Sequence, residues 1–249
     1  IIYGDSVIFG GNLLSNERLA TTTLKRKLNL INNNYEIGNI SSGSWGPGNW
    51  LAHMKERGIY NADHILIVIN SNDFYDVPNY ESIDKNSRLP NKKPLFATIY
   101  FAKRYLFPKV KNIFDSITRI NFSNNEKHLL LKKDNRKNPK ERKNSLEDIK
   151  EIIKILKTKN TGISVIQFWD KNEFLNNKPR NSNLIMRDIF RKNNINTLQS
   201  IDYFKNCSSN SDDLYSDNMH VYKSLGQDCL ADLMKKSLES NKSLEINKK

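Results

Sequence analysis

The sequence predicts an α/β fold, a three-layer α/β/α sandwich around a mostly parallel five-stranded sheet. Five short apolar runs bounded by turn residues are predicted as strands: Ile1–Tyr3, Tyr35–Ser41, His64–Asn70, Ile163–Trp169 and Asn196–Ile201. Segments between most of these runs are predicted as helices: Ser15–Leu28, Asn49–Arg57, Ser145–Lys157, Met186–Lys192 and Ser224–Leu238. Strands that alternate with helices favour a parallel sheet with helices on both faces.

Local signals support these elements in turn. Ser15 is a candidate cap for the first long helix, with Glu17 in its first turn, and Gly58 follows the second helix as a C-cap. The helix from Ser145 repeats apolar residues at helical spacing: Ile149, Ile152, Ile153 and Leu156. The longest apolar run, Ile65–Ile69, is far too short to span a bilayer, so the chain as given is not predicted to be an integral membrane protein.

One segment, residues 74–144, breaks this alternation and is predicted as an inserted basic, aromatic-rich subdomain of helices and loops between the third and fourth strands. Its centre, Pro94–Ile120, interleaves aromatic residues with lysine and arginine. Residues 85–143 hold 17 Lys or Arg against 4 Asp or Glu, so the whole net charge of +13 lies in this stretch. Concentrated positive charge attracts phosphates, anionic lipid or acidic polysaccharide.

Three roles for residues 85–143 follow from this charge. The stretch contacts an anionic membrane surface, forms a lid for an anionic or lipid-linked substrate, or is a solvated elaboration whose aromatic residues pack on the main domain. No recognised nucleic-acid motif is present, so no nucleic-acid partner is expected.

The two cysteines, Cys207 and Cys229, show neither metal-ligand spacing nor a disulfide framework, and we expect free thiols. No metal ion or cofactor is expected. Abundant asparagine and lysine suggest a bacterial source, for which a cytoplasmic or membrane-peripheral location is favoured. Because Ile1 already lies inside a predicted strand, an upstream targeting segment stays open.

Ser6 is the first candidate for chemistry because it follows the first predicted strand. Open α/β sheets bind their ligands in the crevice at the carboxyl ends of the strands. A serine hydroxyl is a weak nucleophile until a neighbouring base takes its proton, so the chain must also supply that base. Gly4-Asp5-Ser6 alone is a common turn sequence, and its position after the strand favours a functional role.

Two further loops begin at the same predicted edge. The second strand leads into a glycine-rich loop, Ser42–Asn49, which is able to aim a backbone N–H at a developing oxyanion. The third strand ends at Asn70-Ser71-Asn72-Asp73, where the Asn72 amide would supply another donor. A tight strand-to-helix turn and an Asx turn are the purely structural alternatives for these two loops.

Asp217 and His220 are the candidate acid and base. Their spacing of three residues places both side chains on one face of a turn or first helical turn. Asp217 would accept a hydrogen bond from one imidazole nitrogen while the other nitrogen faces Ser6. The other three histidines lie in a helix, at a strand start and in the basic segment: His53, His64 and His128.

In their order and positions, Gly4-Asp5-Ser6, the glycine-rich loop, Asn72-Asp73 and Asp217-x-x-His220 resemble the motifs of SGNH (GDSL-type) hydrolases. The resemblance covers Ile1–Asp73 and Ile163–Leu238 but not the insert. It implies a single SGNH-hydrolase-like domain over residues 1–249.

By this resemblance, Ser6 is the nucleophile, His220 the base and Asp217 the acid that orients it. The oxyanion hole would consist of the Ser6 N–H, one N–H of the second motif and the Asn72 side chain. Either Gly43 or Ser44 fills the second position, and the sequence leaves both open. Asn70 stands where the family often has glycine, a departure that we expect to be harmless.

Together these residues predict a serine esterase or deacylase that forms an acyl-serine. We expect an acetylated carbohydrate as substrate, mostly by analogy with the family that the motifs resemble, and Trp45, Trp50 and Trp169 would suit a sugar ring. The candidate substrate-binding residues are Asp5, Trp45, Asn49 and Asp73. The expected partner is an ester, with an acylated or lipid-linked polysaccharide as one form of it.

Two other functions stay open at this stage. One is an O-acyltransferase that uses the same triad on a polysaccharide, with a sugar hydroxyl in place of water. The other belongs to a different class, a non-catalytic protein that binds an anionic surface such as a membrane or polyanion.

Overall fold

The computed structural model describes residues 1–11, 13–31, 34–76, 98, 101, 106 and 139–240, with side chains from 145 onward in the last range. Its sheet has five strands: β1 (Ile2–Gly4), β2 (Asn39–Ser41), β3 (His64–Asn70), β4 (Gly162–Phe168) and β5 (Asn196–Gln199). All four pairings are parallel, in the order β2-β1-β3-β4-β5. The predicted α/β class with a five-stranded parallel sheet is confirmed.

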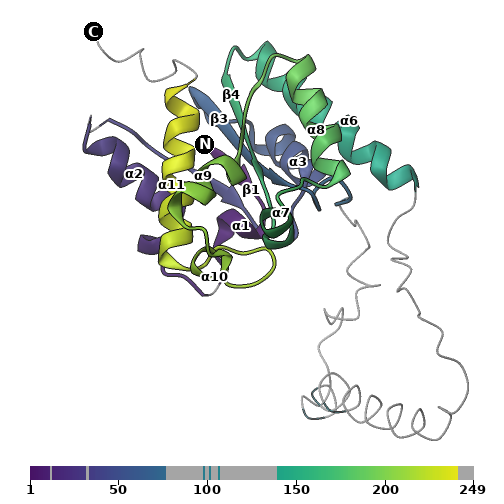
Figure 1. The fold of residues 1–249 in the computed structure, drawn as a ribbon. Helices are drawn as coiled ribbons and strands as arrows, with labels where there is room; N and C mark the ends of the chain where they lie inside the picture. The colour runs from purple at the N-terminus through teal and green to yellow at the C-terminus, as the bar shows by residue number, and fades with distance from the viewer. Residues whose placement is uncertain are drawn as a thin grey trace, which may run out of the picture. The chain divides into compact units, whose positions relative to one another are not determined.

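Helices cover both faces of this sheet (Figure 1). One face packs against α1 (Ser6–Phe9), α2 (Ala20–Asn29), α9 (Ser200–Cys207) and α11 (Ser224–Glu239). The other face packs against α3 (Pro47–Arg57), α6 (Pro139–Thr158) and α8 (Asn181–Lys192). Three short helices lie in the connections: η1 (Asn16–Arg18), α7 (Lys171–Asn176) and α10 (Ser211–Leu214).

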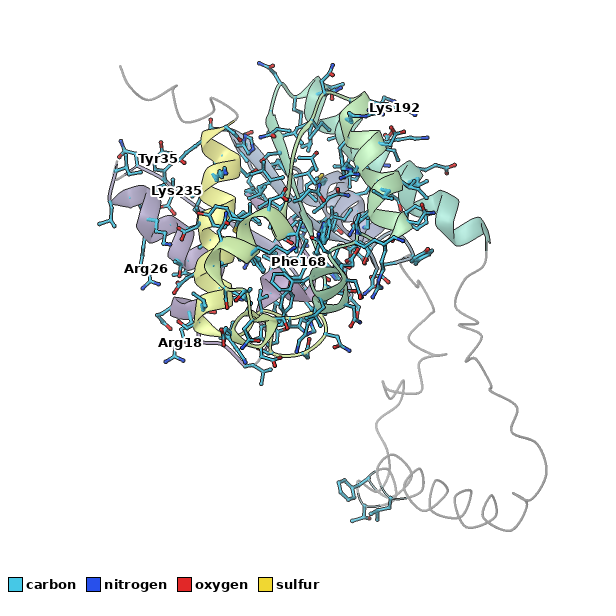
Figure 2. The ribbon with its side chains drawn as sticks, viewed as in Figure 1. Arg18, Arg26, Tyr35, Phe168, Lys192 and Lys235 are labelled. Carbon is cyan, nitrogen blue, oxygen red and sulfur yellow. A yellow bond between two sulfur atoms is a disulfide. The ribbon has the colours of Figure 1, made fainter. Side chains whose placement is uncertain are left out.

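The residues of β3 explain why both faces are covered. Ile65, Ile67 and Ile69 point into the core on the α3, α6 and α8 side, whereas Leu66 and Val68 point into the other core. All seven residues of β3 are buried, as expected for a central strand of a parallel sheet. In Figure 2, Phe168 of β4 lies within the ribbon, while charged side chains such as Arg18, Arg26 and Lys192 project outward.

Element boundaries differ from the predicted ones for identifiable reasons. The second strand begins at Asn39 rather than Tyr35, because the Asn29 side chain hydrogen-bonds to both the N–H and the C=O of Tyr35. The predicted helix Ser15–Leu28 is divided into η1 and α2 by the extended residue Leu19. The fifth strand ends at Gln199, where α9 begins. Gly58 closes α3 with a φ of 73°, as predicted for a C-cap.

The chain forms two compact units, one made of Ile1–Pro78 and Lys137–Lys249 and the other of Asn79–Arg136. The sheet and its helices belong to the first unit. Most of the predicted insert, residues 74–144, lies outside the described residues, so its helices and membrane contact stay predictions. Its ends are described: Phe74 is buried in the core, and α6 begins at Pro139. Within the described ranges, no helix is long and apolar enough to cross a membrane.

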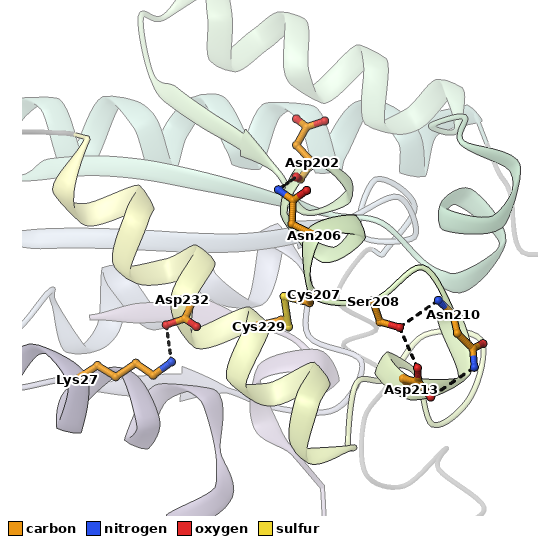
Figure 3. The surroundings of a disulfide bond; sticks show 9 residues. All are labelled: Lys27, Asp202, Asn206, Cys207, Ser208, Asn210, Asp213, Cys229 and Asp232. Carbon is orange, nitrogen blue, oxygen red and sulfur yellow. Dashed lines mark hydrogen bonds and ion pairs between the residues drawn. A yellow bond between two sulfur atoms is a disulfide. The ribbon is translucent and has the colours of Figure 1, made fainter.

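The expectation of free thiols is wrong. Cys207, at the end of α9, and Cys229, in α11, form a disulfide, with their Cα atoms 6.4 Å apart (Figure 3). Packing of α9 against α11 brings the two residues together, and a separation of 22 residues in sequence does not reveal it. Such bonds persist mainly in oxidising compartments.

We expect the double variant Cys207→Ser, Cys229→Ser to unfold more easily than the wild type, by about 2–4 kcal/mol. The reason is that the disulfide restricts the unfolded chain by closing a loop between α9 and α11. Urea unfolding with and without a reductant measures the difference. Reductant should destabilise the wild type and leave the double variant unchanged. Equal unfolding midpoints for the oxidised wild type and the double variant would contradict this prediction.

Candidate active site

Ser6 stands at the carboxyl end of β1 as the first residue of α1, and it is half-buried. The turn is tight: a Cβ on Gly4 would lie 2.5 Å from a side-chain carbon of Ile8, so glycine is needed there. Asp5 caps the helix, because its Oδ1 accepts the Val7 N–H at 2.8 Å. These local constraints place the Ser6 hydroxyl at the edge of the sheet where the predicted crevice lies.

His220 lies next to Ser6 although 214 positions separate them in sequence. Its Nε2 is 2.9 Å from the Ser6 Oγ. The loop that carries His220 connects α10 to α11, and the C=O of Asn218 accepts the Lys171 N–H at 2.9 Å. This bond ties the loop to the start of α7, which itself follows β4. The fold therefore brings His220 to the carboxyl edge of the sheet.

Asp217 holds the imidazole from the other side. Its Oδ2 is 2.7 Å from His220 Nδ1, and its Oδ1 accepts the backbone N–H groups of Met219 and His220. Partial burial raises the pKa of Asp217, but the bonds from His220 and Met219 outweigh it, so the pKa lies below its ordinary value. Since a carboxylate only accepts, Nδ1 must donate the proton, which leaves Nε2 as the acceptor for the Ser6 hydroxyl.

Tyr222 completes this side of the site, and the sequence analysis missed it. Its ring stacks on the imidazole of His220, with centroids 4.8 Å apart and planes 20° apart. Its hydroxyl donates to the backbone C=O of Ser6 at 3.2 Å. Tyr222 thus restricts the rotation of His220 and ties its loop to the backbone of the serine. The only local signal is an aromatic residue two positions after His220.

Asn70 joins the ends of β1 and β3, so the departure from glycine has a structural role. Its Nδ2 donates to Asp5 Oδ2, its Oδ1 accepts the Asn72 N–H, and its backbone N–H donates to Asp73 Oδ2, each at 2.8 Å. Burial raises the pKa of Asp5, and burial together with the charge of Asp5 raises the pKa of Asp73 well above its ordinary value. This buried network shapes the turn that presents Asn72.

Several predicted substrate contacts are buried instead. Asp5 and Asp73 are 7% and 0% exposed, so they support the site from beneath, and their burial argues against contact with substrate. Trp50 is buried with its Nε1 donating to the Gly4 C=O, and Trp169 is buried with its Nε1 donating to Gln199. Neither ring is a surface for a sugar.

Of the remaining candidates, Asn49 helps to cap α3, because its Oδ1 accepts the Gly46 N–H at 3.2 Å. Trp45 is half-buried beside His53, with ring centroids 6.4 Å apart. Its ring is therefore only partly available to a ligand.

The oxyanion candidates are exposed at the same edge. Gly43 and Ser44 lie in a turn closed by a bond from the Trp45 N–H to the Ser42 C=O, and Ser44 has a left-handed φ of 60°. The described hydrogen bonds include no acceptor for either N–H, so both candidates stay open. Asn72 is exposed, and its Oδ1 accepts a hydrogen bond from Arg180 at 3.0 Å.

The other histidines do not approach Ser6 in the described structure. His53 Nδ1 is 3.1 Å from the Tyr3 hydroxyl, and His64 Nε2 is 2.8 Å from the Ser164 hydroxyl. Burial lowers the pKa of His64 to about 4, so it is neutral at pH 7. His128 lies outside the described residues. Among the residues described, no group of three or more His, Cys, Asp or Glu is arranged to hold a metal ion.

The fold that positions these residues is shared with several solved structures. No family model and no curated protein matches the chain. Esterase EstA from a Pseudoalteromonas species shares its structure with a TM-score of 0.54 and 14% identity, over 96% of this chain and 95% of that one. The acetyl xylan esterase AlAXEase has a TM-score of 0.57 and 13% sequence identity, over 95% of this chain and 98% of that one. A member of the lipolytic protein G-D-S-L family from Veillonella parvula has a TM-score of 0.50 and 11% sequence identity, over 99% of this chain and 96% of that one.

The chain has the SGNH (GDSL-type) hydrolase fold. The predicted resemblance is thereby confirmed at the level of the fold. Sequence identities of 11–14% support a shared fold and nothing beyond it. Within this SGNH-type fold, the motif residues of β1, β3 and the loop before α11 meet at one edge of the sheet.

The substitution Asn70→Ala tests the buried network. It leaves the Asp5 carboxylate without its amide donor, and we expect the free energy of unfolding to fall by about 2–3 kcal/mol near neutral pH. Burial raises the pKa of Asp5, so in the pH range between its unfolded and folded pKa values Asp5 is protonated in the folded state and ionised in the unfolded state. The protonated carboxyl needs the donor less, so the loss should shrink in acid and grow as the pH rises.

Urea unfolding at about pH 4.5 and about pH 7.5 measures this difference. Asn176→Ala is the matched control, because the Asn176 amide is exposed and, among the described residues, bonds to the Asn172 C=O alone. That variant should stay within about 0.5 kcal/mol of the wild type at both pH values. An equal loss for Asn70→Ala at the two pH values would contradict the role assigned to Asp5.

Proposed function

We propose that the protein is a serine ester hydrolase that works through an acyl-serine intermediate. The observation that carries the proposal is the chain of hydrogen bonds from Asp217 through His220 to the Ser6 hydroxyl, with distances of 2.7 and 2.9 Å. A carboxylate, an imidazole and a hydroxyl in this order form the arrangement that activates serine in unrelated hydrolases. The fold shared with esterases supports the same reaction class.

In the first half of the reaction, Ser6 Oγ attacks the ester carbonyl carbon and its proton passes to His220 Nε2. Asp217 stays ionised, because its pKa is below the ordinary value, and it stabilises the imidazolium. The negative charge on the carbonyl oxygen is held by the Ser6 N–H, the N–H of Gly43 or Ser44, and the Asn72 amide. The C–O bond to the alcohol then breaks, and the alcohol leaves with the proton from His220.

In the second half, water attacks the acyl-serine and gives a proton to His220. A second oxyanion forms in the same hole. When it collapses, the bond from the acyl carbon to Ser6 Oγ breaks, and His220 returns the proton to the serine. Ester and water are thereby converted into carboxylic acid and alcohol, and the enzyme is restored. A sugar hydroxyl in place of water would make the same steps an acyl transfer.

For the substrate, we propose a short acyl ester, preferably an acetyl group on a carbohydrate. AlAXEase, one of the proteins with this fold, is an acetyl xylan esterase. The exposed edge near the site is polar, with Gly43, Ser44 and Asn72, and this suits an acceptor rich in hydroxyl groups. Burial of Trp50 and Trp169 leaves Trp45 as the tryptophan best placed to contact a sugar ring.

The nucleophile is tested by labelling with a fluorophosphonate and by steady-state hydrolysis of an aryl acetate. Ser6→Ala should abolish labelling and lower kcat by about 10⁴–10⁶-fold, and His220→Ala should have a similar effect, because the two groups act as a unit. Ser42→Ala is the control, because it removes the hydroxyl of another half-buried serine that is outside the hydrogen-bond chain. Labelling or turnover that survives Ser6→Ala in a folded protein would refute the role of Ser6. A folded wild type that neither takes up the label nor hydrolyses the ester would favour a non-catalytic binding protein.

The substrate class is tested with aryl esters of increasing acyl length beside an acetylated polysaccharide. We expect kcat/KM to fall as the chain lengthens beyond acetyl and acetate to be released from the polysaccharide. A maximum at long acyl chains would overturn the acetyl preference. Transfer of the acyl group to an added sugar faster than its release as acetate would identify a transferase.

A further inference from the structure

The carbonyl oxygen of Asn72 is already engaged, and this fixes the direction of its amide nitrogen. Arg180 Nη1 donates to Asn72 Oδ1 at 3.0 Å. The described hydrogen bonds include no acceptor for Asn72 Nδ2. An amide side chain carries its oxygen and its NH₂ group on one carbon, so holding the oxygen points the donor the other way. An amide turned by half a rotation would instead present oxygen to a developing negative charge.

Arg180 is itself held in place by buried carboxylates. Its Nη2 pairs with the carboxylate of Asp170, which is 2% exposed and caps α7 directly after β4. Its backbone N–H donates to Glu173 Oε1 at 2.6 Å. Glu173, also buried, accepts the Ser71 hydroxyl at 3.1 Å and the Asn183 amide at 2.9 Å. The guanidinium is therefore held between Asp170 and Asn72, while the Arg180 backbone is anchored at Glu173.

This arrangement ties the turn after β3 to the end of β4. Ser71 bonds to Glu173, and its neighbour Asn72 bonds to Arg180, so two successive residues of the turn contact the α7–α8 segment. On its other side, the same turn bonds to Asn70. The orientation of Asn72 is thus set from both flanks, with Arg180 acting on its side chain and Asn70 on its backbone.

We propose that Arg180 is a positioning residue for the oxyanion hole, which orients and polarises the Asn72 amide. The inference rests on the proposed hydrolase function. A guanidinium that donates to the amide oxygen draws electron density from the NH₂ group and makes it a stronger donor. Its positive charge also favours the negative charge that develops in the transition state. Both effects act on the transition state more than on the bound ester.

Kinetics should therefore separate this role from substrate binding. An interaction made only in the transition state lowers kcat and kcat/KM together and leaves KM unchanged. Removal of an oxyanion donor typically costs about 10²–10³-fold in kcat. We expect Arg180→Met, which keeps an apolar stem and removes the donors, to lower kcat by about 10-fold or more, with Arg180→Lys recovering part of the loss because it keeps the charge.

The decisive experiment is a double-mutant cycle with Asn72→Ala on an aryl acetate. If Arg180 acts mainly through Asn72, Arg180→Met should lower kcat far less once the Asn72 amide is gone, because only the direct effect of its charge remains to be lost. Arg187→Met is the matched control, since Arg187 is an exposed arginine on α8, the helix that Arg180 precedes as N-cap residue, and its kcat should equal that of the wild type. Urea unfolding of each variant, with Arg180→Lys as the milder change, verifies that kcat is compared between folded proteins.

Two outcomes would overturn the proposal. An equal loss from Arg180→Met with and without Asn72 would mean that Arg180 acts independently of the amide. A rise in KM at constant kcat would mean that it contacts the ground-state substrate. Failure of the proposed function appears differently, as a wild type without ester turnover or as turnover or phosphonate labelling that survives Ser6→Ala.

Discussion

The hydrogen bond from the Asn70 amide to the Asp5 carboxylate joins the carboxyl ends of β1 and β3, and the geometry at Ser6 depends on it. Asp5 caps the helix that begins at Ser6, and Asn70 shapes the turn that presents Asn72. A buried carboxylate is costly unless donors surround it, so this contact strongly restricts both turns. The proposed nucleophile and the proposed oxyanion donor are therefore positioned by one buried contact.

The other half of the site arrives from a distant part of the chain. His220 lies on a loop that runs between Cys207 and Cys229, the ends of a covalently closed segment. Tyr222 adds a second tether by stacking on the imidazole and bonding to the Ser6 backbone. The covalent closure limits how far the loop can move, and Tyr222 sets how the imidazole faces the hydroxyl. A rigid base is valuable, because a misplacement of about 1 Å can cost about 10²-fold in rate.

The structure also changes the argument about substrate. Trp50 and Trp169 fill the two cores of the sandwich, each with its indole N–H bonded to an internal oxygen. Of the three tryptophans in the sequence, these two therefore offer no exposed aromatic surface to a ligand. What the edge presents instead is polar backbone, the amide of Asn72 and the charge of Arg180, which is 45% exposed. Such an edge supports the proposal of a small, oxygen-rich ester over one with a long acyl chain.

The sequence by itself determined the sheet and the proposed catalytic residues, since β3 was predicted at its observed boundaries and Ser6, Asp217 and His220 were all named. Apolar periodicity depends on neighbours in the chain, which is why it predicted the strands and helices. The pairing of Ser6 with His220 across 214 positions came from the resemblance of the motifs to a known family. Tertiary structure alone decided the disulfide, the bond from Tyr222 to the Ser6 backbone and the bond from Arg180 to Asn72, which spans 108 positions. Those contacts arise where separate elements pack together, and spacing in sequence carries no measure of that packing.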